Sequence, residues 1–139
     1  MASPARRPDQ VPGLPGPRES AAQVAAEPLD QPRDIGWIIT LVGAIGTLLA
    51  SWTLFGLKSD GMWAGYWTSF FGTAAVLGAA WLRSTLPTAP GVTLTALSGI
   101  GLILTGALHD YATLIQVPMI AGGAVIVLGA ALQAAPRRT

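Results

Sequence analysis

Long apolar runs separated by short polar breaks fill the chain from residue 35 onward. The runs cover residues 35–57, 62–82, 91–108 and 114–135, and none of them contains Asp, Glu, Lys or Arg. Each run is 18 to 23 residues long, and an α-helix needs about 20 residues to cross the hydrocarbon layer of a bilayer. Apolar and polar residues do not alternate within the runs as they do in membrane β-strands. The pattern therefore predicts four transmembrane helices.

The expected fold class follows from lipid as the solvent. Backbone groups in lipid must form their hydrogen bonds within the segment itself, which selects helices, and short connections place successive helices antiparallel. We therefore expect an all-α protein, an integral membrane four-helix bundle over residues 35–135. The breaks agree with this, because Lys58 to Gly61 offers a turn with N-cap candidates. Pro87 and Pro90 discourage continuation of the second helix.

The first 34 residues differ sharply from the rest of the chain. They hold seven of the eleven prolines and nine of the fifteen charged residues, and they contain no Trp, Tyr, Phe or Ile. Such a segment cannot bury enough apolar surface to offset the entropy of ordering. Residues 1–34 are therefore predicted to form a disordered, Pro- and Arg-rich cytoplasmic tail. No apolar segment follows Arg6 and Arg7 as a signal peptide requires, and a short basic C-terminal tail covers residues 136–139.

Composition supports a lipid environment and narrows the chemistry. Hydrophobic residues make up 51% and charged residues 11% of the chain, against roughly 25% charged residues in soluble proteins. The net charge of +1 gives no reason to expect nucleic acid as a partner. The absence of Cys and the presence of a single His argue against disulfides, thiol chemistry and common zinc sites. We expect neither an enzyme nor a bound cofactor or metal.

Basic residues predict the orientation in the membrane. Arg18 and Arg33 precede the first run, Arg83 lies between the second and third runs, and Arg138 follows the fourth beside a second Arg, whereas Lys58 lies on the other side. Because cytoplasmic loops carry the excess of Lys and Arg, both termini are predicted to be cytoplasmic. Trp residues near the run ends predict aromatic belts at the two interfaces. The Arg-, Ala-, Gly- and Pro-rich composition is typical of a GC-rich genome and indicates a bacterial plasma membrane.

The second and fourth runs share a stretch of sequence. Residues 71–81 align with residues 122–132 at an offset of 51, with six identities. Residues 41–43 parallel residues 97–99 at an offset of 56. We interpret these matches as an internal repeat of a two-helix hairpin. Its two copies would be related by a pseudo-twofold axis along the membrane normal.

One stretch within residues 41–82 resembles a known family. The segment ASWTLFG (residues 50–56), followed by a Trp-bearing stretch and Gly72, is similar to the SPW-repeat membrane proteins of high-GC Gram-positive bacteria. That resemblance implies a small multipass protein built from two-helix units, and it implies no particular activity. The chain departs from the family's Ser-Pro-Trp signature because Ser51 directly precedes Trp52, and LTG (residues 104–106) stands where the second signature is expected.

Glycine and small hydroxyl-bearing residues recur at helical spacing along the runs. In lipid, stripes of small residues let helix backbones approach closely and so replace the hydrophobic drive for association. We therefore expect these positions to pack helices together, within the bundle or against a partner. The candidates are Gly36, Thr40, Gly43, Thr47, Ser51, Gly65, Ser69, Gly72, Gly78, Gly99, Gly123 and Gly129.

Three polar side chains are candidates for specific contacts. Gln116 lies within the fourth run, where an amide is expected to hydrogen-bond a neighbouring helix. His109 and Asp110 form a titratable pair at a predicted membrane boundary. His109 suits the C-terminal end of the third helix, and Asp110 could cap the fourth. An outer-face proton or metal site is the alternative, although one His and one carboxylate fall short of a usual metal ligand set.

These features together predict a structural or accessory plasma-membrane protein. Its partners would be the lipid bilayer and either a larger membrane protein or further copies of the chain in a homo-oligomer, bound through small-residue helix faces. The alternative is an oligomeric channel or small transporter, since four short helices enclose little space alone. Proton-coupled transport is disfavoured, because no carboxylate or His lies in the middle of a run.

Overall fold

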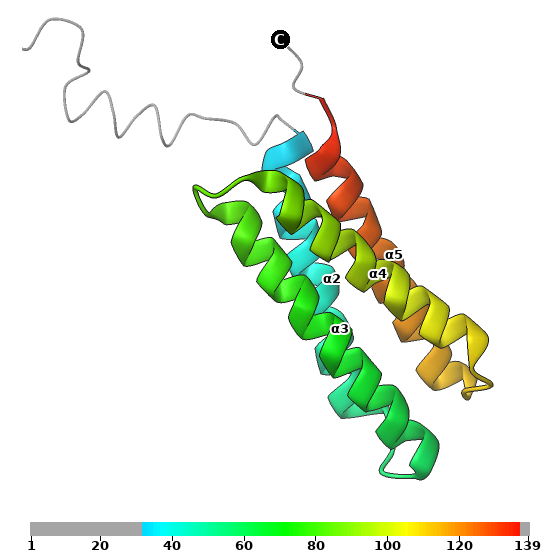
Figure 1. Ribbon diagram of the computed structural model, residues 1–139. Coiled ribbons are helices and arrows are strands. Elements are labelled where there is room, and N and C mark those ends of the chain that lie inside the picture. Colours follow the sequence, from blue (N-terminus) through cyan, green and yellow to red (C-terminus); the bar gives the residue numbers. More distant parts are fainter. Residues whose placement is uncertain (1–31, 137–139) are drawn as a thin grey trace, which may run out of the picture. The chain divides into compact units, whose positions relative to one another are not determined.

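A computed structural model describes residues 32–136, with side chains from Ile35 onward. The predicted N-terminal tail up to residue 31 and the C-terminal tail from residue 137 lie outside this part of the chain. The described residues form four α-helices and no strand, which confirms the predicted all-α, four-helix class. In chain order the helices are α2 (Pro32–Leu54), α3 (Ser59–Arg83), α4 (Thr88–Leu108) and α5 (Thr113–Ala134) (Figure 1).

The helix boundaries differ from the predicted ones by up to three residues. α2 begins at Pro32 and ends at Leu54, each three positions earlier than predicted, and α3 and α4 begin three positions early at Ser59 and Thr88. These helices open with a polar or Pro-containing turn that the apolar pattern does not include. Pro32 and Pro90 both lie in a first turn, where the missing N–H leaves no helical hydrogen bond unmade.

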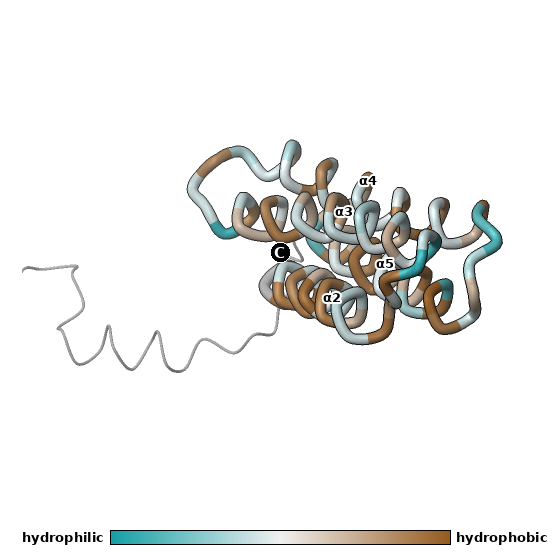
Figure 2. The backbone as a smooth tube through the Cα atoms, turned by 90° about the horizontal axis from the view of Figure 1, so that it is seen from below, coloured by the Kyte–Doolittle hydropathy of each residue, from teal (hydrophilic) through white to brown (hydrophobic). Residues whose placement is uncertain are grey.

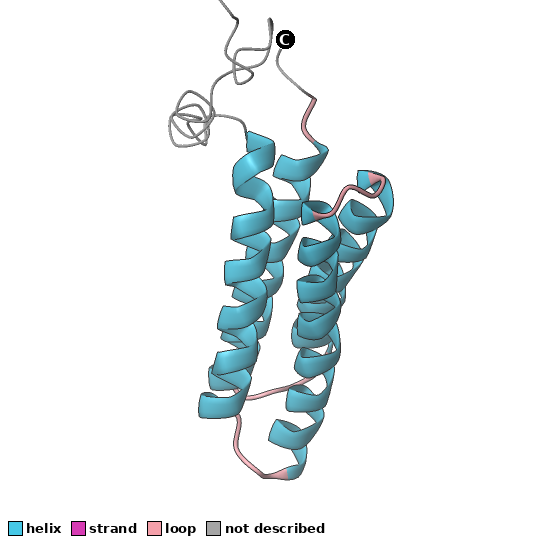
Figure 3. Ribbon diagram, turned by 90° about the vertical axis from the view of Figure 1, so that its left-hand side faces the viewer, coloured by secondary structure: helices cyan, strands magenta, loops and turns pink. Residues whose placement is uncertain are grey.

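The four helices form a ring in which each packs against the next, and α5 closes the ring against α2. Each helix runs antiparallel to its neighbours in the chain (Figure 1). Loops 55–58 and 109–112 lie at one end of the bundle, which we call the hairpin-loop end (Figure 3). Loop 84–87, the start of α2 and the end of α5 lie at the other, which we call the terminal end.

Small side chains fill the interior of the bundle, and large apolar ones point outward. Most buried positions hold Gly, Ala, Ser or Thr, and the largest fully buried side chains are Leu102, Met119 and Ile126. Val42 and Trp52 are 63% and 81% exposed. Such a surface is costly in water, whereas in lipid it is solvated and the small interior residues bring backbones together. Figure 2 shows that strongly hydrophilic positions gather at the loops.

Three of the described helices are long and apolar enough to cross a membrane. They are Ile35–Leu54 within α2, the whole of α4 and the whole of α5. α3 is not among them, although no charged residue lies between Asp60 and Arg83. Its Trp, Tyr, Ser and Thr residues lower its mean hydropathy. On the strength of the other three helices, the chain is a membrane protein.

The bundle has two halves, α2–α3 and α4–α5, and the buried positions of the second repeat those of the first at constant sequence offsets. Each buried residue of α4 lies 55 positions after a buried residue of α2. From Ile115 to Ala130, each buried residue of α5 lies 51 positions after a buried residue of α3. The offset of 51 between α3 and α5 is the predicted one, but the offset between α2 and α4 is 55 rather than the predicted 56. At 55, Thr40 corresponds to Thr95, and both are fully buried.

Candidate interaction surfaces

Reciprocal glycines join α2 to α5. A Cβ atom placed on Gly36 would lie 2.8 Å from the carbonyl oxygen of Gly129, and one placed on Gly129 would lie 2.7 Å from the carbonyl oxygen of Gly36. Thr40 packs against Gly129, and Thr47 packs against Gly122 two turns along. Each threonine occupies the space that a glycine leaves open, so the two backbones touch.

The contact between α3 and α4, on the opposite side of the ring, repeats this arrangement. Thr95 of α4 packs against Gly78 of α3. By the offsets of 55 and 51, this pair corresponds to Thr40 and Gly129. The equivalence therefore extends from the burial pattern to specific pairs of contacting residues.

Two further glycine contacts complete the ring. Between α4 and α5, a Cβ on Gly99 would lie 2.8 Å from the carbonyl oxygen of Gly123, and a Cβ on Gly123 would lie 2.6 Å from that of Gly99. Between α2 and α3, a Cβ on Gly72 would meet the Leu48 side chain at 2.8 Å. Close packing at all four sides of the ring thus depends on glycine.

The bundle itself occupies most of the small-residue positions that the sequence marks as packing candidates. Those buried between helices are Gly36, Thr40, Gly43, Thr47, Ser51, Gly72, Gly78, Gly99, Gly123 and Gly129. Gly65 and Ser69 of α3 lie elsewhere. Apart from its chain neighbours and the nearby backbone of α3, no atom comes within 4 Å of a Cβ placed on Gly65, and Ser69 is only half-buried. One stripe of small residues is therefore left open.

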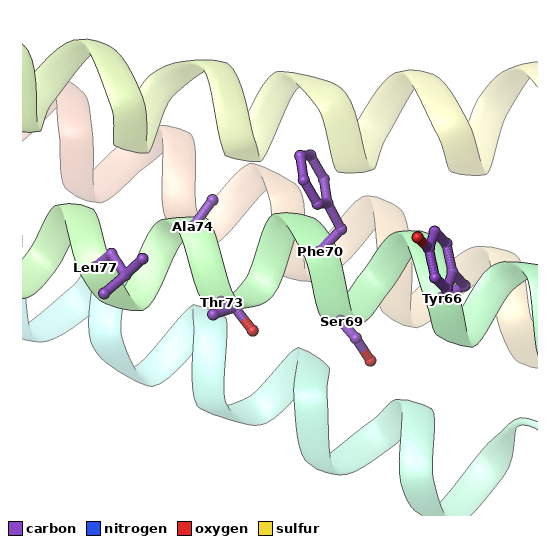
Figure 4. A pocket seen from close by; sticks show the side chains of 6 residues that line it. All are labelled: Tyr66, Ser69, Phe70, Thr73, Ala74 and Leu77. Atoms are coloured by element: carbon purple, nitrogen blue, oxygen red, sulfur yellow. The ribbon is translucent and has the colours of Figure 1, made fainter.

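The outer face of α3 is hollowed along this open stripe. A depression of about 430 Å³ is lined by Tyr66, Ser69, Phe70, Thr73, Ala74 and Leu77. A second depression, of about 490 Å³, adjoins it at Tyr66 toward the hairpin-loop end. Figure 4 shows Ser69 and Thr73 presenting their hydroxyls in the same direction from successive turns. We call Gly65, Ser69 and Thr73, spaced four residues apart, the α3 stripe.

Polar side chains close the C-terminal end of α4. The Nε2 of Gln116, on α5, donates a hydrogen bond to the carbonyl oxygen of Gly106 at 3.0 Å. The Nδ1 of His109 lies 3.1 Å from the carbonyl oxygen of Thr105, and it must carry the proton because a carbonyl can only accept. Two of the four carbonyls that a helix end leaves unpaired are thereby satisfied.

Asp110 does not cap α5 as the sequence suggests. The N-cap position of α5 is Ala112, which makes no side-chain cap hydrogen bond, and the helix begins at Thr113. The backbone N–H of Tyr111 bonds to the carbonyl oxygen of His109 at 2.8 Å. This tight turn places Asp110 two residues before the cap, exposed at the loop surface.

Gln116→Met should lower the free energy of unfolding by about 1 kcal/mol. The substitution keeps the side-chain length but leaves the Gly106 carbonyl without its donor. Val117→Met, at the next position of α5 and 56% exposed, is the matched control and should leave stability unchanged. Detergent-mixture titration with SDS, followed by circular dichroism, measures both variants. Equal unfolding curves for the two would remove the energetic role assigned to this hydrogen bond.

The pKa of Tyr111, in loop 109–112, is affected by its burial and by a charge from the other hairpin. Its ring packs against the core and stacks on His109 with a centroid separation of 5.2 Å. Burial raises the pKa of Tyr111 above its ordinary value of 10.0, and the negative charge of Asp60 raises it further. Asp60 lies in the first turn of α3, so the charge comes from the neighbouring hairpin.

The raised pKa of Tyr111 predicts a loss of stability at high pH. Above pH 10.0 the unfolded chain ionises this tyrosine while the folded chain keeps it protonated. The contribution is therefore fully present below that pH and is lost as pH rises through the folded pKa. Asp60→Asn should lower the folded pKa but leave it above 10.0, since burial is the larger cause. Ultraviolet titration of a Tyr66→Phe variant reads Tyr111 alone, and an unchanged curve after Asp60→Asn would contradict the assignment.

Aromatic and basic side chains tie the helices together at the terminal end. The indole Nε1 of Trp81 donates to the carbonyl oxygen of Pro87 at 3.0 Å, which joins the end of α3 to the start of α4. The guanidinium of Arg83 lies over the ring of Trp37, 4.8 Å from its centroid. This cation–π contact joins the end of α3 to the first turns of α2.

Comparison of the chain with known protein families, with characterised proteins and with solved structures finds no match. Its function has to be inferred from its own surfaces. Among the described residues, the α3 stripe combines small residues, hydroxyls and a depression without a helix packed over it. That face is the candidate interaction surface.

Proposed function

We propose that this protein spans a bacterial plasma membrane four times and has a structural or accessory role. It binds a partner membrane protein or a second copy of itself through the outer face of α3. The α3 stripe carries the proposal, because Gly65 has no packed neighbour and Ser69 and Thr73 line an open depression. In lipid, small residues let a second helix come close, and their hydroxyls can hydrogen-bond across the contact.

The composition of α3 supports the same surface. α3 packs between α2 and α4 and has a loop at each end, so we place it across the bilayer with them. It is the helix that apolarity alone does not mark as a span. A helix with hydroxyls on its outer face is better covered by protein than by lipid chains. The low hydropathy of α3 and its open stripe therefore both favour a protein partner at its outer face.

We also propose that α2–α3 and α4–α5 are copies of one two-helix unit, the organisation that the resemblance to SPW-repeat proteins implies. The shared burial register and the corresponding Thr–Gly contacts support this. Both termini would be cytoplasmic, with Arg83 near the cytoplasmic interface and Lys58 on the opposite side. The distribution of basic residues supports that orientation.

Cysteine labelling tests the four-span arrangement, because the chain contains no Cys of its own. Ser59→Cys and Ser84→Cys place a single thiol at the two ends of α3 in full-length protein. A membrane-impermeant maleimide applied to intact cells or spheroplasts should label the first variant directly and the second only after permeabilisation. Labelling of both variants from the same side would overturn the proposed span of α3.

Photocrosslinking tests the interaction surface. Thr73→Cys places a thiol-linked photoreactive probe on the α3 stripe, and Ala124→Cys places it at the corresponding exposed position of α5, 51 residues later. We expect adducts in native membranes from Thr73→Cys and few from Ala124→Cys. An adduct of twice the chain mass identifies self-association, and a heavier one identifies an accessory role. Equal adducts from both positions, or none, would overturn the proposal.

The geometry gives less support to an oligomeric channel. Thr40, Thr47 and Ser51, the hydroxyl-bearing positions of α2 that could line a pore between copies, are 0%, 3% and 5% exposed. They face neighbouring helices of the same chain, and Thr47 and Ser51 bond to carbonyls of their own helix. A pore between copies would need a different polar lining.

A further inference from the structure

An apolar groove of about 220 Å³ runs between α2 and α3 at the terminal end of the bundle. It is lined by Trp37, Leu41, Val76, Ala79, Ala80 and Arg83. The two alanines leave space on the α3 side, where Ala79 is buried, and Leu41 and Val76 are partly buried. Arg83 is the one charged residue of the lining, and it stands at the end of α3.

The guanidinium of Arg83 has donors to spare. It lies over the Trp37 ring, and because a guanidinium carries five N–H donors, donors remain for other partners. Among the side chains that the structure describes, no carboxylate forms an ion pair with it. The planar guanidinium fork matches the oxygens of a phosphate ester in a two-hydrogen-bond arrangement. A cation next to an apolar groove is complementary to an amphiphile with an anionic head.

We propose that this groove binds one anionic phospholipid. The phosphodiester accepts hydrogen bonds from Arg83, and part of one acyl chain lies along Leu41, Val76 and the two alanines. The inference rests on the proposed span of α3, which sets Arg83 at the depth of the lipid headgroups. Basic pockets between transmembrane helices on the cytoplasmic side are a favourable setting for anionic lipids.

The corresponding position in the other half of the bundle lacks the recognition group. At the offsets of 55 and 51, Val92 and Ala134 stand where the groove has Trp37 and Arg83. Val127, Ala130 and Ala131 correspond to Val76, Ala79 and Ala80, so the α5 wall is nearly the same. Within the described part of the chain, this control surface thus has matched small residues and no cation among the corresponding positions, and we expect one lipid per chain.

Lipid retention by the full-length protein tests the proposal. Protein reconstituted in nanodiscs with equimolar phosphatidylglycerol and phosphatidylcholine is released into mild detergent, and bound lipid is counted by native mass spectrometry. The protein should retain one phosphatidylglycerol, preferred about fivefold over phosphatidylcholine. Arg83→Gln should abolish the preference, whereas Lys58→Gln, which removes the same charge at the hairpin-loop end, should keep it.

Filling the groove provides a second variant that leaves the charge intact. Ala80→Phe should reduce retention of either lipid, and Ala131→Phe, at the corresponding position of α5, should not. Free glycerol phosphate should fail to displace the lipid, since it has no chain to occupy the groove. Equal retention of both lipids, identical behaviour of Arg83→Gln and Lys58→Gln, or displacement by glycerol phosphate would each overturn the site. Cysteine labelling of Ser59→Cys and Ser84→Cys separately reports whether α3 spans the membrane.

Discussion

Gly129→Ala should lower the free energy of unfolding of the bundle by about 2 kcal/mol, although Ala is the better helix former. The added methyl would lie 2.7 Å from the carbonyl oxygen of Gly36 and 2.7 Å from the backbone nitrogen of Thr40. Both atoms belong to the backbone of α2. No side-chain rotation can relieve such a clash, so α2 and α5 must separate and lose packing along their shared contact.

A glycine of α2 that lies outside the contact with α5 serves as the control. Apart from its chain neighbours and the nearby backbone of α2, no atom lies within 4 Å of a Cβ placed on Gly46, so Gly46→Ala should leave stability unchanged or raise it slightly. SDS titration of both variants in mixed micelles, followed by circular dichroism, gives the comparison. If the two variants unfold at the same SDS fraction, the contact between α2 and α5 is looser than the structure shows.

The number and type of the helices could be predicted because an isolated apolar segment in lipid can satisfy its backbone hydrogen bonds only as a helix. A charge-free apolar run of spanning length has to be a helix, and each of the four runs became one. The first residue of each helix could not be predicted from the apolar pattern in the same way. Ser59 and Thr88 begin helices in polar turns, because a helix starts where its hydrogen bonds start and not where apolarity does.

The small-residue spacing identified helix faces but could not say what each face meets. Thr40 and Ser69 both belong to stripes with helical spacing, yet Thr40 lies against Gly129 inside the bundle while Ser69 lines an open depression on α3. Which stripe stays open depends on how four helices divide their contacts, and that is a property of the assembled ring. The first helices of the two halves share five identities at an offset of 55 and three at 56, so the sequence already favours the offset that the burial register shows.

The two halves of the bundle contribute side chains of different size to the buried core. Where one member of a corresponding pair is Leu, Ile or Met and the other is Ala or Thr, the larger residue always lies in α4 or α5. The pairs are Thr47 with Leu102, Ala64 with Ile115, Thr68 with Met119 and Ala75 with Ile126. We infer that small residues of one half make room for large residues of the other, since several of both kinds belong to one buried cluster. The two hairpins are complementary in volume, although their backbones follow one register.

Exchanging one such pair should therefore be tolerated better than changing either member. Ile126→Ala leaves a cavity in the core and should cost about 3 kcal/mol. Ala75→Ile adds volume to a filled core and should cost about 2 kcal/mol. Both residues belong to one buried cluster, so the double variant keeps the total volume. We expect its loss of stability to be smaller than the sum of the single losses by about 2 kcal/mol.

The exposed pair Leu77 and Leu128, also 51 positions apart, separates this effect from a general loss of apolar contacts. These side chains are 60% and 54% exposed, and lipid or detergent can fill the space that truncation leaves. Leu77→Ala, Leu128→Ala and their combination should cost little and should add. Additive losses for the core pair as well would mean that Ala75 and Ile126 do not share a common space. A positive coupling confined to the core pair would show that the complementary volumes of the two hairpins hold the bundle together, because lipid can replace every contact except those in the interior.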